Sequence, residues 1–192
     1  CWGLNNKGQL GDNSTTDSEV PVQVSGLTGV VSIDGAGTST CAVKADGSVW
    51  CWGENNKGQL GDGSTADSLV PVQVKDASGT GVLADGFEVG CGKQRACASL
   101  GDGTLWCWGL NDKGQLGDGS KDDSSLPVQV TGTSGPPATL GSAASPSRGY
   151  GDGDTHACVG QFDGTVLCWG HNNNGQLGNG DTNDQLAPVQ FF

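Results

Sequence analysis

The sequence predicts an all-β repeat protein built from short antiparallel strands, and three observations carry that prediction. First, three short markers recur four times in the same order and always advance by the same 50, 56 and 61 residues. Second, glycine makes up 35 of the 192 residues, which in a periodic pattern indicates many tight turns. Third, no stretch keeps a 3.6-residue hydrophobic period, so helix is expected to be minor.

The repeat is constant over one part of its length and variable over the rest. The markers are Cys-Trp-Gly at 1–3, 51–53, 107–109 and 168–170, Gly-Gln-Leu-Gly at 8–11, 58–61, 114–117 and 175–178, and Pro-Val-Gln at 21–23, 71–73, 127–129 and 188–190. Length changes only after Pro-Val-Gln, so we expect one array over 1–192 with units of about 1–24, 25–74, 75–130 and 131–192. The variable segments 75–90 and 131–149 are candidate binding loops, with a tolerated insertion as the alternative.

The charge of the chain argues against two classes of partner. The formal net charge is −12, which repels nucleic-acid backbones and anionic membranes. No run approaches the roughly 20 apolar residues that a membrane helix needs. We therefore expect no nucleic-acid partner and no membrane insertion, and the acidic surface is best explained as a means of keeping a glycine-rich β protein soluble.

Each full repeat offers about four short strands, as the second repeat illustrates. Val30–Ile33 is β-branched and bounded by glycines, which is typical of a strand. Residues 41–44 and 48–52 form a hairpin across Ala45-Asp46-Gly47, because Asp-Gly suits a three-residue loop that ends with glycine in the left-handed region. The outer segment Val70–Val74 has a proline at its start, which is typical of an edge strand.

The hairpin register brings cysteines together across the strands. Counting back from the turn, Lys44 faces Ser48 and Cys41 faces Cys51, at a site where Cα atoms are about 4.5 Å apart. That separation lies at the near edge of disulfide geometry. The same arithmetic holds around Gly101–Gly103 and around Phe162–Gly164. The predicted disulfides are Cys41–Cys51, Cys97–Cys107 and Cys158–Cys168.

Reduced, buried thiols are the alternative for these six residues, because cysteine packs well as a small apolar side chain. Zinc fits less well, since zinc sites need cysteines two to four residues apart that converge with a second pair. The repeated cross-strand pattern favours disulfides, which imply an extracellular, periplasmic or cell-surface protein. The pattern leaves Cys1 and Cys91 unpaired; Cys91 has no counterpart in the other repeats and is either a free thiol or bonds to a group outside the chain.

The loop that contains Gly-Gln-Leu-Gly is expected to be held by side chains rather than by regular structure. Leu60 should pin the loop to the core, and Asn55 and Gln59 should hydrogen-bond to neighbouring backbone. Paired aspartates recur in the loop, and oxygen-rich loops can hold calcium. The spacing matches neither known calcium-loop pattern, and Asn179 replaces the first aspartate in the last repeat. Turn capping is the preferred interpretation, so we expect no metal and no cofactor.

Catalytic chemistry finds little support in the sequence. His156 and Cys158 lie two residues apart and point to one face of a strand, as a nucleophilic pair would require. Cys158 is expected to be bonded to Cys168, however, and nothing comparable recurs. His171 occupies an interchangeable loop position. We therefore predict no catalytic residue and no enzyme activity.

The repeat resembles that of the regulator of chromosome condensation family, and the resemblance covers essentially the whole chain. It is carried by Cys-Ala, Asp-Gly-x-Val-Trp-Cys-Trp-Gly-x-Asn-x-x-Gly-Gln-Leu-Gly-Asp-Gly and Pro-x-x-Val. The cysteine-containing form resembles the bacterial secreted branch. The resemblance implies a seven-bladed β-propeller, of which this chain would form an open part of about four blades. The family often has His two residues before the first hairpin cysteine, where this chain has Ser39, Arg95 and His156.

The chain is also expected to be a fragment. It begins inside a repeat at Cys1 and contains no Met. An arc of about four blades exposes an apolar face at each end, so the remaining blades of the same parent chain are expected partners. The isolated chain should then self-associate or be marginally stable.

The leading functional hypothesis is a non-catalytic module that binds a protein or a glycan through the variable loops of an extracellular propeller. One alternative is a guanine-nucleotide exchange factor or chromatin-associated regulator, as in the family namesake. A second alternative is a secreted protein inhibitor of an enzyme, which rests on analogy of fold alone.

Overall fold

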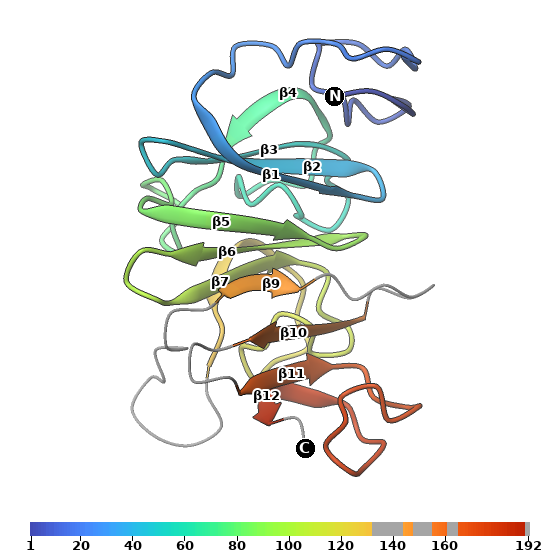
Figure 1. Ribbon diagram of the computed structural model, residues 1–192, viewed down its shortest axis with the longest axis vertical. Coiled ribbons are helices and arrows are strands. Elements are labelled where there is room, and N and C mark those ends of the chain that lie inside the picture. The colour runs from blue at the N-terminus through green and yellow to red at the C-terminus, as the bar shows by residue number, and fades with distance from the viewer. Residues whose placement is uncertain (132–143, 148–154, 161–164, 191–192) are drawn as a thin grey trace.

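Three four-stranded antiparallel sheets follow one another along the chain in the computed structural model, which describes residues 1–131, 144–147, 155–160 and 165–190 (Figure 1). The strand orders are β1-β2-β3-β4, β5-β6-β7-β8 and β12-β11-β10-β9, so each sheet is a meander. The strands are β1 (Val30–Ala36), β2 (Ser39–Lys44), β3 (Val49–Gly53), β4 (Ser68–Gln73), β5 (Gly86–Cys91), β6 (Arg95–Leu100), β7 (Leu105–Gly109), β8 (Ser124–Gln129), β9 (Ala144–Ser147), β10 (His156–Gly160), β11 (Val166–Gly170) and β12 (Gln185–Gln190).

The prediction of an all-β partial propeller is confirmed. The sheets are its blades, stacked along the long axis of the molecule, and the leading repeat caps one end of the stack (Figure 1). In that leading repeat Gly3 and Ser18 form an isolated bridge, and Cys1 and Val22 also exchange two backbone hydrogen bonds. None of the residues that the structure describes forms a helix able to cross a membrane.

The central hairpin of each blade has the predicted register. Between β2 and β3 the Lys44 and Ser48 backbones close the turn, with the Lys44 N–H 3.0 Å from the Ser48 carbonyl oxygen. Gly47 has φ of +77°, the left-handed conformation that the Asp-Gly pair predicts. Cys41 then lies opposite Cys51. The β6–β7 hairpin repeats this arrangement, whereas the predicted turn at 162–164 lies outside the described residues.

Strand limits differ from the prediction at the inner and outer edges of the blade. β1 continues to Ala36, and β4 runs Ser68–Gln73 rather than 70–74. β1 pairs with β2 through a register shift between Val30 and Ser32, so Val31 bulges out of the ladder. A bulge of this kind inserts one extra residue and re-aims its side chain. The β5–β6 pair has the same shift between Gly86 and Glu88.

The hydrophobic core lies between the blades rather than inside one sheet. Val43 and Val49 from the first blade are fully buried against Val89 and Trp108 of the second blade. Another cluster joins the second and third blades, and the third blade contributes Val159 and Trp169 to it. Each repeat therefore depends on its neighbours for burial, as stacked repeats do.

Candidate functional site

One buried asparagine organises the Gly-Gln-Leu-Gly loop in every repeat. Asn55 is fully buried, and its Oδ1 accepts a hydrogen bond from the Leu60 N–H at 2.9 Å. Its Nδ2 donates to the Ala66 carbonyl oxygen at 3.0 Å. Gln59 Oε1 accepts from the Lys57 N–H at 2.8 Å, and Leu60 is fully buried. The predicted roles of these loop residues are therefore confirmed, and the same position is occupied by Asn5, Asn111 and Asn172.

The aspartates of this loop act as acceptors for that asparagine. Asp67 Oδ1 accepts from the Asn55 N–H at 2.8 Å, and Asp62 Oδ1 accepts from Asn55 Nδ2 at 3.2 Å. In the last repeat Asn179 Oδ1 accepts from Asn172 Nδ2 at 3.1 Å, so a neutral amide oxygen serves as well as a carboxylate. Within the described residues no group of three or more His, Cys, Asp or Glu is placed to hold a metal ion. These contacts support turn capping rather than calcium binding.

A tryptophan–carbonyl contact joins each repeat to the one before it. The fully buried Trp108 donates from Nε1 to the Gln59 carbonyl oxygen at 2.9 Å. A Cβ on Gly61 would lie 2.9 Å from that same nitrogen, and Gly61 has φ of +68°. Both the lack of space and the left-handed backbone conformation therefore require glycine at this position. The same donor–acceptor pair recurs as Trp52 to Gln9 at 2.9 Å and Trp169 to Gln115 at 3.0 Å.

Polar contacts at the outer rim reinforce the joints between repeats. The Asn13 N–H donates to the Leu69 carbonyl oxygen at 3.0 Å. Lys57 Nζ lies 3.0 Å from Asp123 Oδ2 of the next repeat, in an exposed ion pair that contributes under about 1 kcal/mol. Together the joints make adjacent repeats one rigid scaffold, on which exposed groups keep fixed positions.

The predicted cysteine pairs lie face to face in their hairpins. The sulfur atoms are 2.06 Å apart in Cys41–Cys51, 2.16 Å in Cys97–Cys107 and 2.11 Å in Cys158–Cys168, and the Cα atoms are 4.0 Å apart in all three. The sulfur atoms of each pair are therefore at bonding distance, and the Cα atoms lie closer together than the about 4.5 Å expected from the register.

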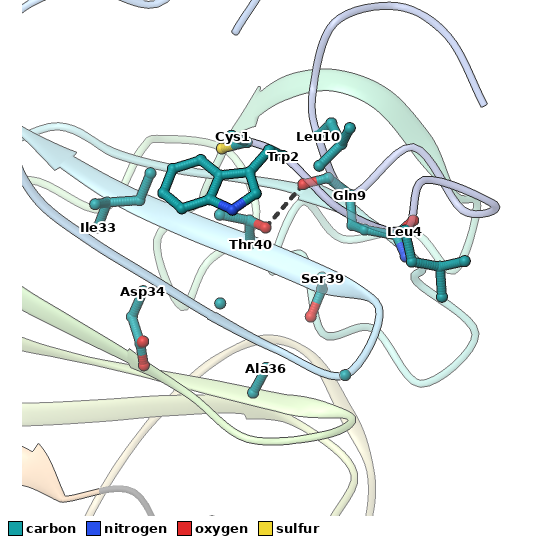
Figure 2. Close-up of a pocket in the computed structure, with 12 residues that line it drawn as sticks. Cys1, Trp2, Leu4, Gln9, Leu10, Ile33, Asp34, Ala36, Ser39 and Thr40 are labelled. Carbon is teal, nitrogen blue, oxygen red and sulfur yellow. Dashed lines mark hydrogen bonds between the residues drawn. The ribbon is translucent and has the colours of Figure 1, made fainter. Parts of the chain in front are cut away.

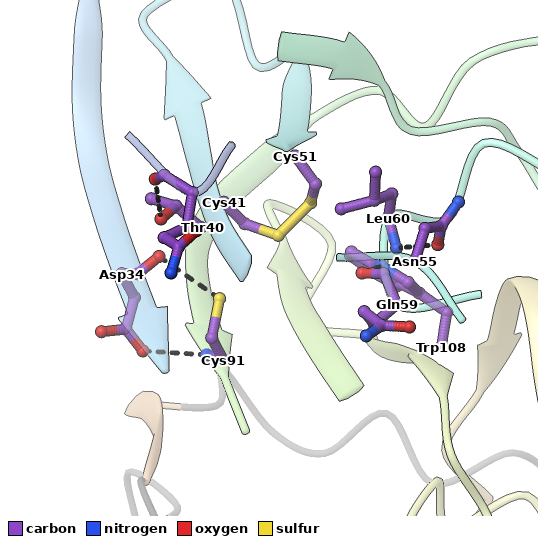
Figure 3. The surroundings of a disulfide bond; sticks show 10 residues. Asp34, Thr40, Cys41, Cys51, Asn55, Gln59, Leu60, Cys91 and Trp108 are labelled. Carbon is purple, nitrogen blue, oxygen red and sulfur yellow. Dashed lines mark hydrogen bonds between the residues drawn. A yellow bond between two sulfur atoms is a disulfide. The ribbon is translucent and has the colours of Figure 1, made fainter. Parts of the chain in front are cut away.

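Cys91 and Cys1 lie in different surroundings. Cys91 belongs to the same buried cluster as the Cys41–Cys51 pair, and its Sγ lies 3.3 Å from the Asp34 carbonyl oxygen (Figure 3). The Cys91 N–H also donates to Asp34 Oδ2 at 2.8 Å, so this thiol is built into the joint between β1 and β5. Cys1 is half-buried beside the leading loop.

A first pocket of about 600 Å³ lies between the leading repeat and β1. Figure 2 shows Trp2 and Ile33 on its walls, with Gln9 bonded through its carbonyl oxygen to Thr40 Oγ1 at 2.9 Å. Ile33 is 50% exposed, whereas Val89, its equivalent in the next blade, is 4% exposed because the preceding hairpin covers it. This pocket is therefore the open face of an inter-blade joint.

A second pocket of about 590 Å³ lies where a hairpin tip meets the entry of the next blade; we call it the hairpin-tip pocket. Its walls come from two blades and include both bulged residues. Val31 is 64% exposed and Phe87 is 69% exposed, although the Phe87 blade has a neighbour on each side. The lining residues are Val31, Lys44, Ala45, Asp46, Gly47, Asp85, Gly86 and Phe87.

The backbone of the hairpin-tip pocket is fixed by contacts on both sides. The Gly86 N–H donates to the Gly47 carbonyl oxygen at 2.8 Å, and the Gly101 N–H donates to the Asp85 carbonyl oxygen at 2.8 Å. Asp85 itself has φ of +62°, a conformation that non-glycine residues rarely adopt. Strained backbone of this kind clusters at functional positions. The Phe87 side chain therefore projects from a backbone segment that is hydrogen-bonded to two hairpin tips.

The charge of the hairpin-tip pocket is acidic. The Asp46 and Asp85 side chains are exposed, and the lining residue Lys44 has its Nζ 3.1 Å from Asp46 Oδ2. Hydrogen bonds from the Ser48 hydroxyl and backbone, and then from Lys44, lower the pKa of Asp46 to about 2. The carboxylate is ionised throughout the physiological range and attracts cationic groups.

The two histidines singled out in the sequence lie in different parts of the fold. The His156 carbonyl oxygen accepts from Arg95 Nη2 of the preceding blade at 2.8 Å. Cys158 lies opposite Cys168 with the two sulfur atoms 2.11 Å apart, so the Cys158 sulfur is paired with cysteine. His171 Nδ1 lies 3.0 Å from Asp184 Oδ1.

The variable segment 75–90 supplies Asp85–Phe87 to the hairpin-tip pocket, whereas most of 131–149 lies outside the described residues.

Sequence reasoning missed the hairpin-tip pocket and the tryptophan–carbonyl joints. The constant spacing of Trp and Gly-Gln-Leu-Gly was the one signal for the joints, since both markers advance by the same step. No local sequence pattern predicts the bulge at which the Phe87 side chain is exposed.

Comparison with known protein families resolves what this architecture is. A family model described as the regulator of chromosome condensation (RCC1) repeat matches residues 1–43, 46–98, 102–143 and 163–191. The chain belongs to the RCC1 repeat family. A second RCC1 repeat model matches residues 30–59 and 88–115, which contain the first strands and hairpins of two blades.

Curated relatives agree with that membership, and a solved structure agrees with the fold. The chain is 34% identical over 191 residues to the mouse E3 ubiquitin-protein ligase HERC2, covering 97% of this chain and 4% of the relative. It is 33% identical over 191 residues to the Arabidopsis thaliana ultraviolet-B receptor UVR8, covering 98% of this chain and 40% of the receptor. The crystal structure of human WBSCR16 superposes with a TM-score of 0.77 at 23% identity, covering 100% of this chain and 47% of that one. The chain thus spans less than half the length of each of these proteins.

Proposed function

We propose that this RCC1-repeat chain is a non-catalytic protein-binding module whose partner docks on the hairpin-tip pocket. The observation that carries the proposal is Phe87, an aromatic side chain 69% exposed on backbone that is hydrogen-bonded to two hairpin tips. Aromatic side chains held in fixed positions are enriched where proteins bind one another. The surrounding pocket of about 590 Å³ gives that side chain a concave setting.

The joints between repeats support the proposal because they pre-organise the surface. Trp108 and its equivalents hydrogen-bond each blade to a loop carbonyl oxygen of the preceding repeat, and Asn55 and its equivalents fix the loops. A binding surface that needs no ordering on association loses less conformational entropy. Variable segments mounted on such a scaffold are where repeat proteins place their binding residues, and segment 75–90 borders the hairpin-tip pocket.

We also propose that the module works in an oxidising compartment, outside the cell or at its surface. Three hairpins each hold a cross-strand cysteine pair at disulfide spacing. Disulfides persist in such compartments and are rare in the cytosol. The ligase and receptor activities in the names of HERC2 and UVR8 belong to those proteins, of which the matching regions are 4% and 40%.

Capture followed by reconstitution tests the proposed function. The protein is used as bait in its native surroundings, each captured protein is purified, and its binding is measured by calorimetry. We expect one protein to bind with 1:1 stoichiometry and a dissociation constant in the micromolar range or tighter, which corresponds to about 8 kcal/mol. Selective retention of glycans with no protein ligand, or turnover of a captured molecule, would contradict the proposal.

A further inference from the structure

We propose that the hairpin-tip pocket takes a cationic segment of a partner protein, in which an arginine or lysine stands next to an apolar residue. The inference rests on the proposed function and specifies the chemistry of the partner at the same site. It is carried by the apolar side chains, the charges and the fixed backbone of the pocket.

The apolar part of the pocket comes from two equivalent bulges in neighbouring blades. Val31 and Phe87 each occupy the extra position where the innermost strand slips against its hairpin. Both side chains are mostly exposed, so neither contributes much to the core. A bulge that costs ladder hydrogen bonds and also exposes an apolar side chain is a feature that folding alone does not need. The pair can hold an aliphatic side chain or the face of a guanidinium group, which stacks on aromatic rings.

The charged side chains of the pocket determine which sign of charge on the partner is favoured. Asp46 and Asp85 border the apolar side chains from opposite blades. Asp102, on the tip of the next hairpin, is exposed, and its own hairpin is tied to Asp85 through the Gly101 N–H. Lys44 is engaged by Asp46 at 3.1 Å and offsets only part of this charge. A cationic segment fits these carboxylates, whereas a phosphorylated or acidic one is repelled.

The backbone of the pocket makes the placement of these groups permanent. A Cβ on Gly47 would lie 3.1 Å from the Asp85 backbone, so the hairpin tip and the blade entry are in contact. A Cβ on Gly86 would lie 2.7 Å from Val49, which shows how closely the entry segment crosses the first blade. The relative positions of the Asp46 and Asp85 backbones are therefore set by the fold, so the pocket can discriminate by position as well as by charge.

Peptide titration followed by nuclear magnetic resonance provides the test. The probes are three peptides of equal length, with cores Arg-Leu-Arg, Glu-Leu-Glu and Arg-Ser-Arg between Gly-Ser flanks. We expect the first peptide to shift the amide signals of Gly47, Gly86 and Phe87 in a saturable way. The acidic peptide should bind at least about ten-fold more weakly, because like charges across an interface are strongly unfavourable. The Arg-Ser-Arg peptide should bind about three-fold more weakly, through loss of apolar contact.

Substitutions locate the binding with matched controls. Phe87→Ser should weaken the Arg-Leu-Arg peptide about ten-fold, because it removes the aromatic face. Asp85→Asn should weaken it about three-fold, and Asn tolerates the positive φ at this position. Asp122→Asn, an exposed change of the same charge on the opposite rim, should leave the affinity unchanged.

The outcomes separate this inference from the proposed function. Equal binding of the acidic peptide, no saturable shift with any probe, or insensitivity to Phe87→Ser and Asp85→Asn would each overturn the cationic-segment proposal. If the natural protein partner is still captured by the Phe87→Ser protein, docking at the hairpin-tip pocket is wrong, and only the broader proposal of a protein-binding module stands. If the unaltered protein captures no protein ligand, the proposed function itself fails.

Discussion

At the scale of single residues, the side chains that fix the turns also set the charge of the surface. Asp46 caps its own hairpin turn by accepting from the Ser48 N–H at 3.0 Å, and it faces the hairpin-tip pocket. The same carboxylate thus has structural partners on both oxygens, Ser48 on Oδ1 and Lys44 on Oδ2, and is still exposed to solvent. Asn55 shows the opposite case, a polar side chain whose hydrogen-bonding groups are all used inside the loop.

The pKa of Asp46 gives a prediction at this scale. The pKa of Asp46 in the folded protein is lowered to about 2. Ionised Asp46 therefore stabilises the fold at pH values above its pKa in the unfolded chain, which is about 4. That contribution is lost as the pH falls from about 4 to about 2. Carbon-detected titration should place its midpoint near 2. Ser48→Ala should raise the midpoint, because the Ser48 hydroxyl is the largest cause of the shift. An unchanged midpoint in Ser48→Ala would show that another group holds the carboxylate.

At the scale of elements, the decisive feature is the joint between one repeat and the next. Trp108 on β7 reaches back to the loop of the preceding repeat, and the loop approaches so closely that only glycine fits at position 61. The stack is therefore held by contacts between elements about fifty residues apart in sequence, in addition to the hairpins within each blade.

Two neighbouring glycines test this joint. Gly61 and Gly63 both have positive φ, +68° and +79°, so alanine is strained at either position by about 1–2 kcal/mol. Only Gly61→Ala also forces a Cβ against Trp108, which adds about 1–3 kcal/mol of overpacking. Urea unfolding should therefore show Gly61→Ala to be clearly less stable than Gly63→Ala. Equal destabilisation would mean that the joint is looser than the structure shows.

The cysteine pairs give a second prediction at the scale of elements. Intact mass after alkylation in denaturant without reductant should leave Cys41, Cys51, Cys97, Cys107, Cys158 and Cys168 unlabelled, and reduction should expose all six. Joint replacement of Cys41 and Cys51 by alanine should cost about 3 kcal/mol, since the bridge closes a loop of about ten residues. Labelling of these six residues before reduction would contradict the oxidising-compartment proposal.

Local chemistry explains how far the sequence could be interpreted. The hairpin across Ala45–Gly47 was predictable, because Asp-Gly fixes the turn and the turn fixes the register of Cys41 against Cys51. The joint from Trp108 to Gln59 was not, since it depends on how closely two repeats stack. The hairpin-tip pocket was missed for the same reason, because the bulge at Phe87 becomes a pocket only when the neighbouring hairpin tip lies beside it.

At the scale of the whole molecule, burial depends on position in the stack. Ile33 and Val89 occupy equivalent places in consecutive blades, yet their exposures are 50% and 4%. Val89 packs on the hairpin of the preceding blade, whereas Ile33 borders the pocket beside Trp2. Two β-branched aliphatic residues in the same strand position therefore contribute differently to stability.

That difference can be measured by paired substitution. Val89→Ala should cost about 2–3 kcal/mol, as large-to-small changes in a core do. Ile33→Ala should cost about 1 kcal/mol or less, which covers its half-buried area and its strand preference. Denaturant unfolding of both variants compares the two positions directly. Equal losses would show that the face beside Trp2 is covered in solution, by another blade or a second copy.

Photo-cross-linking from position 87 tests the central claim, that the protein binds its partner at the hairpin-tip pocket. The analogue p-benzoylphenylalanine replaces Phe87 in one preparation and Val20, which is similarly exposed on the leading repeat, in the other. After irradiation with the captured partner, we expect a cross-link from position 87 to a partner residue flanked by arginine or lysine, and none from position 20. Cross-linking from position 20 with none from position 87 would contradict the claim.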